Sequence, residues 1–503
     1  MPSDPGKVVL VGAGPGDPSL LTLRGQQLLQ KADVVLYDYL VNELVLSHAP
    51  PTAELVCLGR HGTGRMFSQS EVNEQMIAAA HSGKFVVRLK GGDPSVFGRV
   101  AEETAALEAA HVQYEVVPGV TAALAASSYT GIPLTHRDFA SCVAFIAGQE
   151  SREKDESSLD FEYLAKFPGT LVIYMGVTTA PAWATRLLRH GKPASTPVAI
   201  VRHGSLAQQQ VVRTTLGDVP KVLAPGKMRP PAVILVGEVV DSSPAVDWFT
   251  SRPLFGRTLM VTRPEYQADD LIDRLAELGA RALVQPAIRI APVDDFSNID
   301  ASIARLPQFE WLVFSSANGV SHFLDRLLST SNDLRRLGSC RIAAIGPATI
   351  AALDQYHLCA DVMPDEYRAE ALAAKLAPDA AGKRFLLLRA SRGREVLGEA
   401  LTAAGGKVEQ LAVYQSNDVE QADPEVVDLL QTGSVDWITV TSSAIARSLV
   451  LLFGDQLHQT KLAAISPLTA SVLSEAGYSP TVVATEYTTR GLLEAVLDSE
   501  QKA

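Results

Sequence analysis

The stretch KVVLVGAGPGDP at residues 7–18 decides the fold of this chain. Its apolar, β-branched half is typical of a buried strand, its glycines of a tight turn, and the residues after it have a helical pattern. Continuous apolar runs alternating with amphipathic segments are typical of sheets covered on both faces. The sequence therefore predicts an α/β fold. Similar runs are ADVVLYD (32–38), KFVVRLKGG (84–92), QYEVVPG (113–119), CVAFIAG (142–148), TLVIYMG (170–176), TPVAIVRHG (196–204) and PAVILVGEVV (231–240).

Length and composition describe an ordinary globular protein of several domains. The chain has 503 residues, which at roughly 150 per domain suggests about three to four domains. Hydrophobic residues make up 47% and charged residues 20% of the chain, and the mean hydropathy is +0.11. The net charge of −12 argues against a nucleic-acid partner. A local basic cleft for an anionic small molecule stays open.

The cysteines and the lengths of the apolar runs indicate in which cellular compartment the protein is expected. Cys57, Cys142, Cys340 and Cys359 lie far apart, and no Cys/His spacing suits zinc, so we predict neither a disulfide framework nor a metal site. The first residues lack the pattern of a signal peptide, and no apolar run reaches the roughly 18 residues of a membrane-spanning helix. The sequence therefore predicts a cytoplasmic protein with no membrane contact.

The second half contains an internal repeat. GRTLMVTR (256–263) matches GKRFLLLR (382–389), and EWLVFSSANGV (310–320) matches DWITVTSSAIA (436–446), both at an offset of 126 residues. RIAAIGPATIAAL (341–353) matches KLAAISPLTASVL (461–473) at an offset of 120. We expect two similar α/β lobes. Residues 246–255, with two prolines nearby and no apolar periodicity, are expected to be a linker between the halves.

The GAGPGD loop at residues 12–17 is a poor dinucleotide loop. Its spacing is GxGxG, Pro15 removes a backbone donor, and Asp17 would repel a phosphate. A nicotinamide-dependent oxidoreductase is therefore only a remote alternative. RLKGGDP and VPGVTA repeat the strand–turn–helix pattern, and a plain turn with a capping aspartate is the alternative for each motif.

Together, GAGPGDP, VVLYD, RLKGGDP, VPGVTA, GIPLTHR (131–137) and YMG (174–176) resemble the uroporphyrinogen-III C-methyltransferases of the tetrapyrrole methylase family. The resemblance covers about residues 7–245. We expect a domain of residues 1–245 with subdomains of about 7–118 and 119–245. The resemblance implies a homodimer that uses S-adenosylmethionine to methylate uroporphyrinogen III twice, giving precorrin-2. The cofactor contacts it implies are Pro15, Gly91, Gly92, Asp93, Val96, Thr121, Ala122, Met175 and Gly204.

The same resemblance suggests catalytic and substrate-binding residues. Asp38 matches the proposed proton acceptor of the family, although a capping role is the alternative. The family's proposed donor is a lysine 22 positions later, where this chain has Arg60. An arginine stays protonated, so we expect Arg60 to pair with a substrate carboxylate. Arg65, His136 and Arg137 are candidates for the same role.

In the second half, VTRP (261–264), FSSANGV, IGPAT (345–349), VYQ (413–415) and TSS (441–443) resemble uroporphyrinogen-III synthase. The resemblance covers about residues 256–500, and we expect a domain of residues 256–503. That family implies a cofactor-free cyclisation of hydroxymethylbilane with inversion of ring D. It implies one lobe of about 256–287 plus 417–500 and another of about 292–411. Tyr414 falls on the active-site tyrosine of the family, where a phenol could donate to the departing hydroxyl. The expected carboxylate-binding residues are Arg263, Ser316, Thr349, Arg389, Ser443 and Thr469.

The two resemblances place both halves in one reaction sequence. The second half would make uroporphyrinogen III, and the first would methylate it. Helix capping is the alternative role for the serines and threonines at the turns of the second half. A methyltransferase fused to a non-catalytic tetrapyrrole-binding module is the alternative function.

Overall fold

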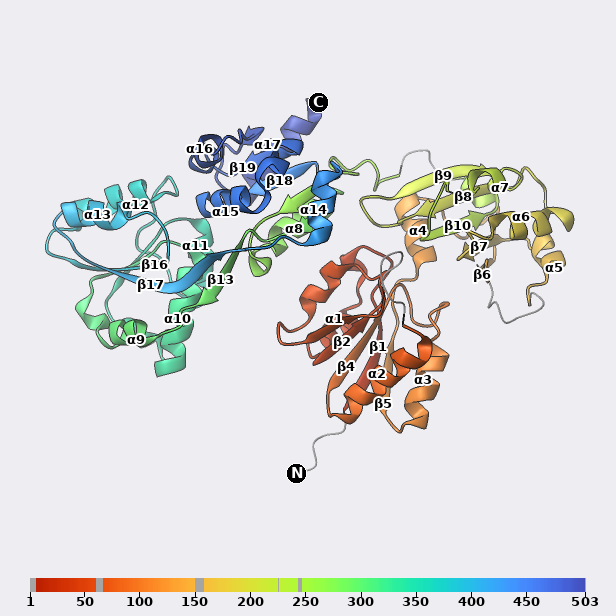
Figure 1. Ribbon diagram of the computed structural model, residues 1–503, viewed down its shortest axis with the longest axis horizontal. Helices are drawn as coiled ribbons and strands as arrows, with labels where there is room; N and C mark the ends of the chain where they lie inside the picture. Colours follow the sequence, from red (N-terminus) through yellow and green to blue (C-terminus); the bar gives the residue numbers. More distant parts are fainter. Residues whose placement is uncertain (1–5, 60–66, 150–157, 225, 243–246, 503) are drawn as a thin grey trace. The chain divides into compact units, whose positions relative to one another are not determined.

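The computed structural model describes residues 6–59, 67–149, 158–224, 226–242 and 247–502 (Figure 1). The chain divides into two compact units. The amino-terminal unit comprises Met1–Arg257 with Glu277–Arg281, and the carboxy-terminal unit comprises Thr258–Ala276 with Ala282–Ala503. The expected α/β class is confirmed, because helices alternate with strands along both units. Among the described helices, none combines the length and the apolar character needed to cross a bilayer.

The first sheet of the amino-terminal unit is parallel, in the order β3-β2-β4-β1-β5. Alternate residues of its apolar strands enter two separate cores, as the pleat requires. Val9 and Val11 pack with α1, whereas Val8 and Leu10 pack with α2 and α3. The bounds are β1 Lys7–Gly12, α1 Leu23–Leu29, β2 Val34–Tyr37, β3 Glu54–Cys57, α2 Gln69–His81, β4 Phe85–Lys90, α3 Val100–Ala109 and β5 Gln113–Val117. Short 3₁₀ turns lie at η1 Pro18–Leu20 and η2 Glu43–His48.

The second sheet of this unit is mixed, in the order β6-β7-β10-β8-β9. Strands β6 and β7 are parallel, whereas β10 runs antiparallel to both β7 and β8. One face packs on α5, α6 and α7, and α4 packs on the other. The bounds are α4 Ala122–Thr130, β6 Val143–Ala147, α5 Phe161–Lys166, β7 Thr170–Tyr174, α6 Ala180–Arg189, β8 Pro197–Arg202, β9 Gln210–Thr215, α7 Val219–Val222, β10 Ala232–Val236 and η3 Glu238–Val240.

The carboxy-terminal unit has two sheets in which four strands follow the same order. The first is β12-β11-β18-β19-β20 and the second is β13-β17-β16-β14-β15. Strand β11 corresponds to β16, β18 to β14 and β19 to β15 in the sequence repeat, so the repeat is a repeat of structure. The first sheet and its helices are β11 Thr258–Val261, η4 Glu265–Gln267, α8 Asp269–Glu277, β12 Arg281–Val284, α14 Pro424–Gln431, β18 Trp437–Val440, α15 Ser443–Phe453, η8 Gly454–Gln459, β19 Lys461–Ala464, α16 Pro467–Glu475, β20 Val482–Val483 and α17 Thr489–Gln501.

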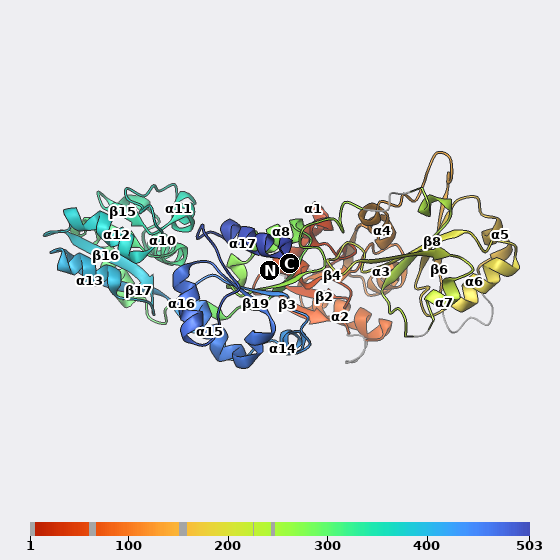
Figure 2. The ribbon, with the colours of Figure 1, turned by 90° about the horizontal axis from the view of Figure 1, so that it is seen from above.

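The second sheet of this unit is covered by helices on both faces (Figure 2). Leu312 and Phe314 of β14 enter the core under α9, α10 and α11, and Val313 between them enters the core under α12 and α13. The bounds are β13 Ile288–Pro292, α9 Ser297–Ala304, η5 Leu306–Gln308, β14 Trp311–Phe314, α10 Ala317–Ser331, η6 Leu334–Leu337, β15 Arg341–Ala344, α11 Pro347–Asp354, α12 Ala369–Leu376, η7 Ala377–Asp379, β16 Arg384–Ala390, α13 Val396–Ala403 and β17 Lys407–Asp418.

Two antiparallel strands carry the chain between the two lobes. Strand β13 pairs with the far end of β17, from Ile288 opposite Asp418 to Pro292 opposite Tyr414 (Figure 1). The same strand β17 pairs in parallel with β16 along its first half. The crossing therefore places Tyr414 at the point where β17 leaves one partner and takes the other.

Candidate active sites

Three glycine turns meet at the carboxyl ends of β1, β4 and β5. The Gly92 amide donates to the Gly14 carbonyl over 2.7 Å, and the Gly14 amide donates to the Gly92 carbonyl over 3.2 Å. A Cβ atom on Gly119 would lie 2.3 Å from the Gly92 carbonyl oxygen. The turns therefore touch backbone to backbone, and Gly92 also has a φ of +71°, which favours glycine.

Asp93 holds two of these turns together. Its Oδ2 accepts from the Gly119 amide over 2.9 Å, and its Oδ1 accepts from the Ser95 amide over 2.8 Å. The Val96 amide donates to the Asp93 carbonyl over 3.2 Å, so the segment from Gly91 to Val96 is one compact turn. Asp93 thus already has an organising role, besides the cofactor contact expected from the sequence.

A fourth turn, after β7, presents apolar side chains beside α4. The hydroxyl of Tyr174 lies 2.7 Å from Thr121 Oγ1 and accepts from the Ala123 amide over 2.9 Å. Met175 follows with a φ of +53° and is half exposed. A half-exposed methionine in the left-handed region is an unfavourable arrangement that is typical of functional sites. The exposed ring of Phe97 lies 5.0 Å from the ring of Tyr174.

The turn after β8 contacts the turn after β1. A Cβ atom on Gly16 would lie 2.8 Å from Leu206 Cγ, and the Asp17 amide donates to Ser205 Oγ over 3.1 Å. Pro15 and Gly204 therefore lie on touching turns. The structure brings together on adjoining turns the residues predicted to bind cofactor, namely Pro15, Gly91, Gly92, Asp93, Val96, Thr121, Ala122, Met175 and Gly204.

Asp38 lies just after β2 and pairs with a buried arginine. Its Oδ1 accepts from Arg88 Nη2 over 2.5 Å. Arg88 also donates to the fully buried Glu103 over 3.1 Å, and Lys90 Nζ lies 2.8 Å from the same carboxylate. Burial, followed by the charge of Arg88, lowers the pKa of Lys90. The Asp38 carboxylate is thus held in place by a buried ion cluster.

The other expected substrate residues of this unit are less organised. His136 is partly exposed, its Nδ1 accepts from the Asp138 amide over 3.1 Å, and its ring lies 4.7 Å from that of Phe139. Arg137 is exposed. Arg60 and Arg65 lie outside the described residues, so the structure does not place them.

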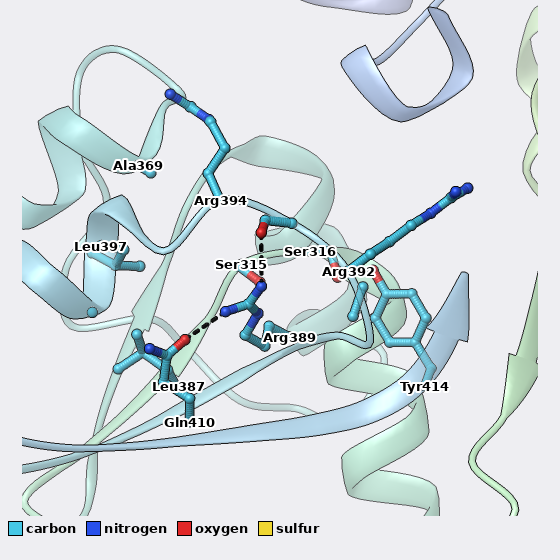
Figure 3. Close-up of a pocket in the computed structure, with 13 residues that line it drawn as sticks. Ser315, Ser316, Ala369, Leu387, Arg389, Arg392, Arg394, Leu397, Gln410 and Tyr414 are labelled. Atoms are coloured by element: carbon cyan, nitrogen blue, oxygen red, sulfur yellow. Dashed lines mark hydrogen bonds between the residues drawn. The ribbon is translucent and has the colours of Figure 1, made fainter. Parts of the chain in front are cut away.

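In the carboxy-terminal unit, a cavity of about 250 Å³ opens beside β16, β17 and the start of α13 (Figure 3). Three of the predicted residues, Ser316, Arg389 and Tyr414, line it. The remaining lining residues are Ser315, Ala369, Leu387, Ala390, Arg392, Gly393, Arg394, Leu397, Gly398 and Gln410.

Tyr414 contributes a buried phenol to this cavity. Its hydroxyl lies 3.0 Å from Ser316 Oγ, and the ring of His322 stacks on it at 5.5 Å. Burial raises the pKa of Tyr414. Hydrogen bonds with Ser316 and Asn318 lower it, but by less than burial raises it. Burial also favours the neutral form of His322, and therefore lowers the pKa of this histidine. The phenol is therefore protonated at neutral pH and can donate a hydrogen bond.

The three arginines of the cavity differ in how much of their hydrogen-bonding capacity is already used. Arg389 donates to Glu395 and Gln410, each over 2.6 Å, and to the Gly393 carbonyl over 3.0 Å (Figure 3). Arg394 donates to Glu370 over 2.5 Å. Arg392 donates to Asp418 over 2.6 Å and to Ser416 over 3.2 Å, and its buried Nη2 has no hydrogen-bond partner among the residues that the structure describes.

The other predicted residues of this unit do not line the cavity. Thr349 is buried in α11. Arg263 donates to Thr441 and to Thr489, each over 3.2 Å, and burial lowers its pKa. Ser443 is the first residue of α15, and Thr469 Oγ1 lies 3.1 Å from Ser466 Oγ. These last three belong to the lobe built on β11 and β18.

Comparison with known proteins accounts for both units. Residues 7–220 match the family of tetrapyrrole (corrin/porphyrin) methylases, and residues 269–494 match the family of uroporphyrinogen-III synthase HemD. A porphyrin biosynthesis protein HemD from Ruminiclostridium josui is 34% identical over 90% of this chain and 89% of its own length. The chain belongs to this two-part family. We call residues 1–257 the methylase half and residues 258–503 the synthase half.

Relatives of the methylase half alone are also known. An S-adenosyl-L-methionine-dependent uroporphyrinogen III methyltransferase from Methanosarcina barkeri is 47% identical over 47% of this chain and 92% of its own length. The crystal structure of a uroporphyrin-III C-methyltransferase from Thermus thermophilus, complexed with S-adenyl homocysteine, is 42% identical over 47% of this chain and 94% of that chain, with a TM-score of 0.40.

Sequence reasoning missed several residues at both sites. In the methylase half these are Arg88, Lys90 and Glu103, although the alternation of two cations along a buried strand signals a shared buried partner. In the synthase half, His322 was missed because its distance in sequence from Tyr414 conceals their stacking. No local pattern reveals such a contact.

Proposed function

We propose that the chain is a bifunctional enzyme of tetrapyrrole biosynthesis. The synthase half cyclises hydroxymethylbilane to uroporphyrinogen III with inversion of ring D, and the methylase half methylates that product twice to precorrin-2. The observation that carries the proposal is that one chain matches both families along nearly its whole length, with a relative matched over 90% of it.

The turns of the methylase half fit S-adenosylmethionine. The backbone approach at Gly14 and Gly92 leaves no side chain in the way, and the half-exposed side chain of Met175 and the ring of Phe97 offer apolar surface to an adenosyl group. When bound, the cofactor supplies an activated methyl group. The chain itself then mainly positions the two reactants, which can contribute about 7–11 kcal/mol.

We assign Asp38 the removal of the proton that the methylated ring must lose. Its carboxylate is partly exposed, and Arg88 fixes its orientation from the buried side. Oδ1 is the oxygen bound to Arg88, which leaves Oδ2 for the substrate.

In the synthase half, we assign Tyr414 the donation of a hydrogen bond to the departing hydroxyl of hydroxymethylbilane. The raised pKa keeps this phenol protonated, and Ser316 orients it. Arg392 is our candidate cation for a substrate carboxylate, because its side chain lines the cavity and is 33% exposed there. Arg389 is instead committed to the surrounding loop.

We further propose that the enzyme is cytoplasmic and forms a homodimer through the methylase half. The four cysteines are all free thiols, which suits a reducing compartment. Light scattering of the purified chain would test the dimer directly.

One anaerobic assay tests the function. Purified protein is incubated with hydroxymethylbilane, with and without S-adenosylmethionine. The products are separated by chromatography and identified by mass spectrometry. We expect uroporphyrinogen III alone without the methyl donor. With it we expect a dimethylated product, heavier by two CH2 units because each methylation is followed by loss of a proton. Isomer I with no mass gain would contradict both activities and favour a binding protein.

A further inference from the structure

The last residues of the methylase half, which lead into the synthase half, pack back on that half. Residues 247–257, here called the anchor segment, form successive turns, and Phe249 and Leu254 within it are buried. Asp247 Oδ1 accepts from the amides of Phe249 and Thr250, which fixes the first turn. The composition of this stretch predicts a linker. In the structure its aromatic residues pack on an apolar surface.

That surface is the carboxy-terminal end of α4, centred on Tyr129. The ring of Phe249 meets the ring of Tyr129 edge to face at 4.7 Å, and the ring of Trp248 lies 5.1 Å from it. The indole of Trp248 also donates to the Ser128 carbonyl over 2.8 Å. The anchor segment therefore confines the Tyr129 ring from outside.

The hydroxyl of Tyr129 leads to the cofactor turns. It donates to Asp17 Oδ2 over 2.7 Å, and the Asp17 amide donates to Ser205 Oγ over 3.1 Å. The Ser205 amide donates to Gln209 Oε1, and Gln209 Nε2 donates to the Tyr129 carbonyl, each over 3.0 Å. These four bonds form a closed circuit, in which Tyr129, Ser205 and Gln209 are all buried.

The circuit connects the two turns that carry Pro15 and Gly204. Ser205 has a φ of +69° and His203 a φ of +51°, so this turn holds an unfavourable conformation that its surroundings must maintain. Asp17 also caps η1 through its other oxygen, which accepts from the Ser19 amide over 2.9 Å. Asp17 thus joins the turn after β1 to α4 through its carboxylate and to the turn after β8 through its backbone amide.

We propose that Tyr129 is a positioning residue for S-adenosylmethionine binding, held in place by Phe249 of the anchor segment. The inference rests on the proposed function of the methylase half. Loss of the hydroxyl or of the Phe249 ring would loosen the turns of Pro15 and Gly204 without removing any group that contacts the tetrapyrrole. Burial, together with Asp17, raises the pKa of Tyr129, so the phenol keeps its proton.

Three variants of the full chain test the proposal: Tyr129→Phe, Phe249→Ala and the control Leu187→Ala. Leu187 is buried in the core under α6, so its truncation destabilises the same half without touching the circuit. S-adenosylhomocysteine binding is measured by calorimetry, the KM for S-adenosylmethionine and for uroporphyrinogen III by methylation, and folding by thermal unfolding.

We expect both Tyr129→Phe and Phe249→Ala to weaken S-adenosylhomocysteine binding about fivefold or more. The KM for S-adenosylmethionine should rise by a similar factor. The KM for uroporphyrinogen III and the cyclisation rate stay as in the wild type. Leu187→Ala lowers the unfolding temperature but leaves the affinity unchanged.

An unchanged affinity of folded Tyr129→Phe for S-adenosylhomocysteine would overturn the proposal. An equal loss of affinity in Leu187→Ala would also overturn it, because the loss would then follow from lower stability alone. Failure of the wild-type chain to bind S-adenosylhomocysteine would instead overturn the proposed function, and the positioning role with it.

Discussion

Tyr414 shows how burial adapts one side chain to a chemical task. Its phenol is 6% exposed, stacked on His322 and within hydrogen-bonding distance of Ser316. Because removal from water disfavours the phenolate, the group keeps its proton well into alkaline pH. A substrate hydroxyl that departs beside it therefore meets a donor in a fixed position.

Replacing Tyr414 by phenylalanine removes only the donor. We expect Tyr414→Phe to slow cyclisation of hydroxymethylbilane by about 100-fold, because a positioned general acid contributes that much. Methylation of added uroporphyrinogen III should be unchanged. Tyr356→Phe is the matched control, since its hydroxyl donates to Asp325 outside the cavity. Equal rates for both variants would remove Tyr414 from the mechanism.

Arg392 is the second residue whose role can be measured. Arg392→Ala should raise the KM for hydroxymethylbilane about tenfold, because a hydrogen bond between charged groups is lost. Arg335→Ala, which breaks only an exposed pair with Asp333, serves as the control and should leave the KM as it is. An unchanged KM in Arg392→Ala would show that the substrate carboxylates are held elsewhere.

Strand β4 and helix α3 together support Asp38. Arg88 and Lys90 lie two residues apart on β4, so both point to the face that α3 covers, where Glu103 compensates their charges. The cluster is buried, and loss of the Glu103 carboxylate would leave Lys90 without its ion-pair partner and Arg88 with Asp38 alone, in a medium of low polarity. The free energy of unfolding of this half therefore depends on Glu103.

Glu103→Gln tests that dependence. We expect a loss of about 3 kcal/mol in the stability of the methylase half, because Lys90 loses its buried counter-charge and Arg88 keeps only that of Asp38. Glu102→Gln on the same helix breaks only an exposed pair with Arg99 and should cost about 0.5 kcal/mol or less. Chemical unfolding followed by circular dichroism compares them. A similar small cost for both would contradict the role given to the cluster.

At the scale of the whole chain, the two halves carry separate chemistries on separate compact units. Gly92→Arg should abolish methylation, since φ at this position favours glycine and the new side chain would fill the cofactor turn. Cyclisation of hydroxymethylbilane by the same variant should proceed at the wild-type rate. Parallel assays on one preparation measure both, and loss of cyclisation as well would show that the activities are not independent.

The sequence by itself determined the α/β class, the repeat in the synthase half and the membership of both families. Each of these depends on patterns within short segments, such as the apolar runs of β1 and β4, the glycines at 14, 91 and 92, and the spacing of Trp311 and Trp437. Such patterns can be read from the sequence because the local backbone geometry restricts which residue types fit at each position.

Only the tertiary structure decided how the side chains use their partners. It committed Arg389 to Gly393 and Glu395 of the following loop, joined Asp38 to Arg88, and docked Phe249 on Tyr129. It also left one buried nitrogen of Arg392 without a partner among the described residues. The contacts of Phe249 and of Asp38 each join residues 50 or more positions apart. Whether a charged or aromatic side chain is solvated, paired or buried depends on such distant neighbours, because burial and electrostatic pairing are properties of the packed fold.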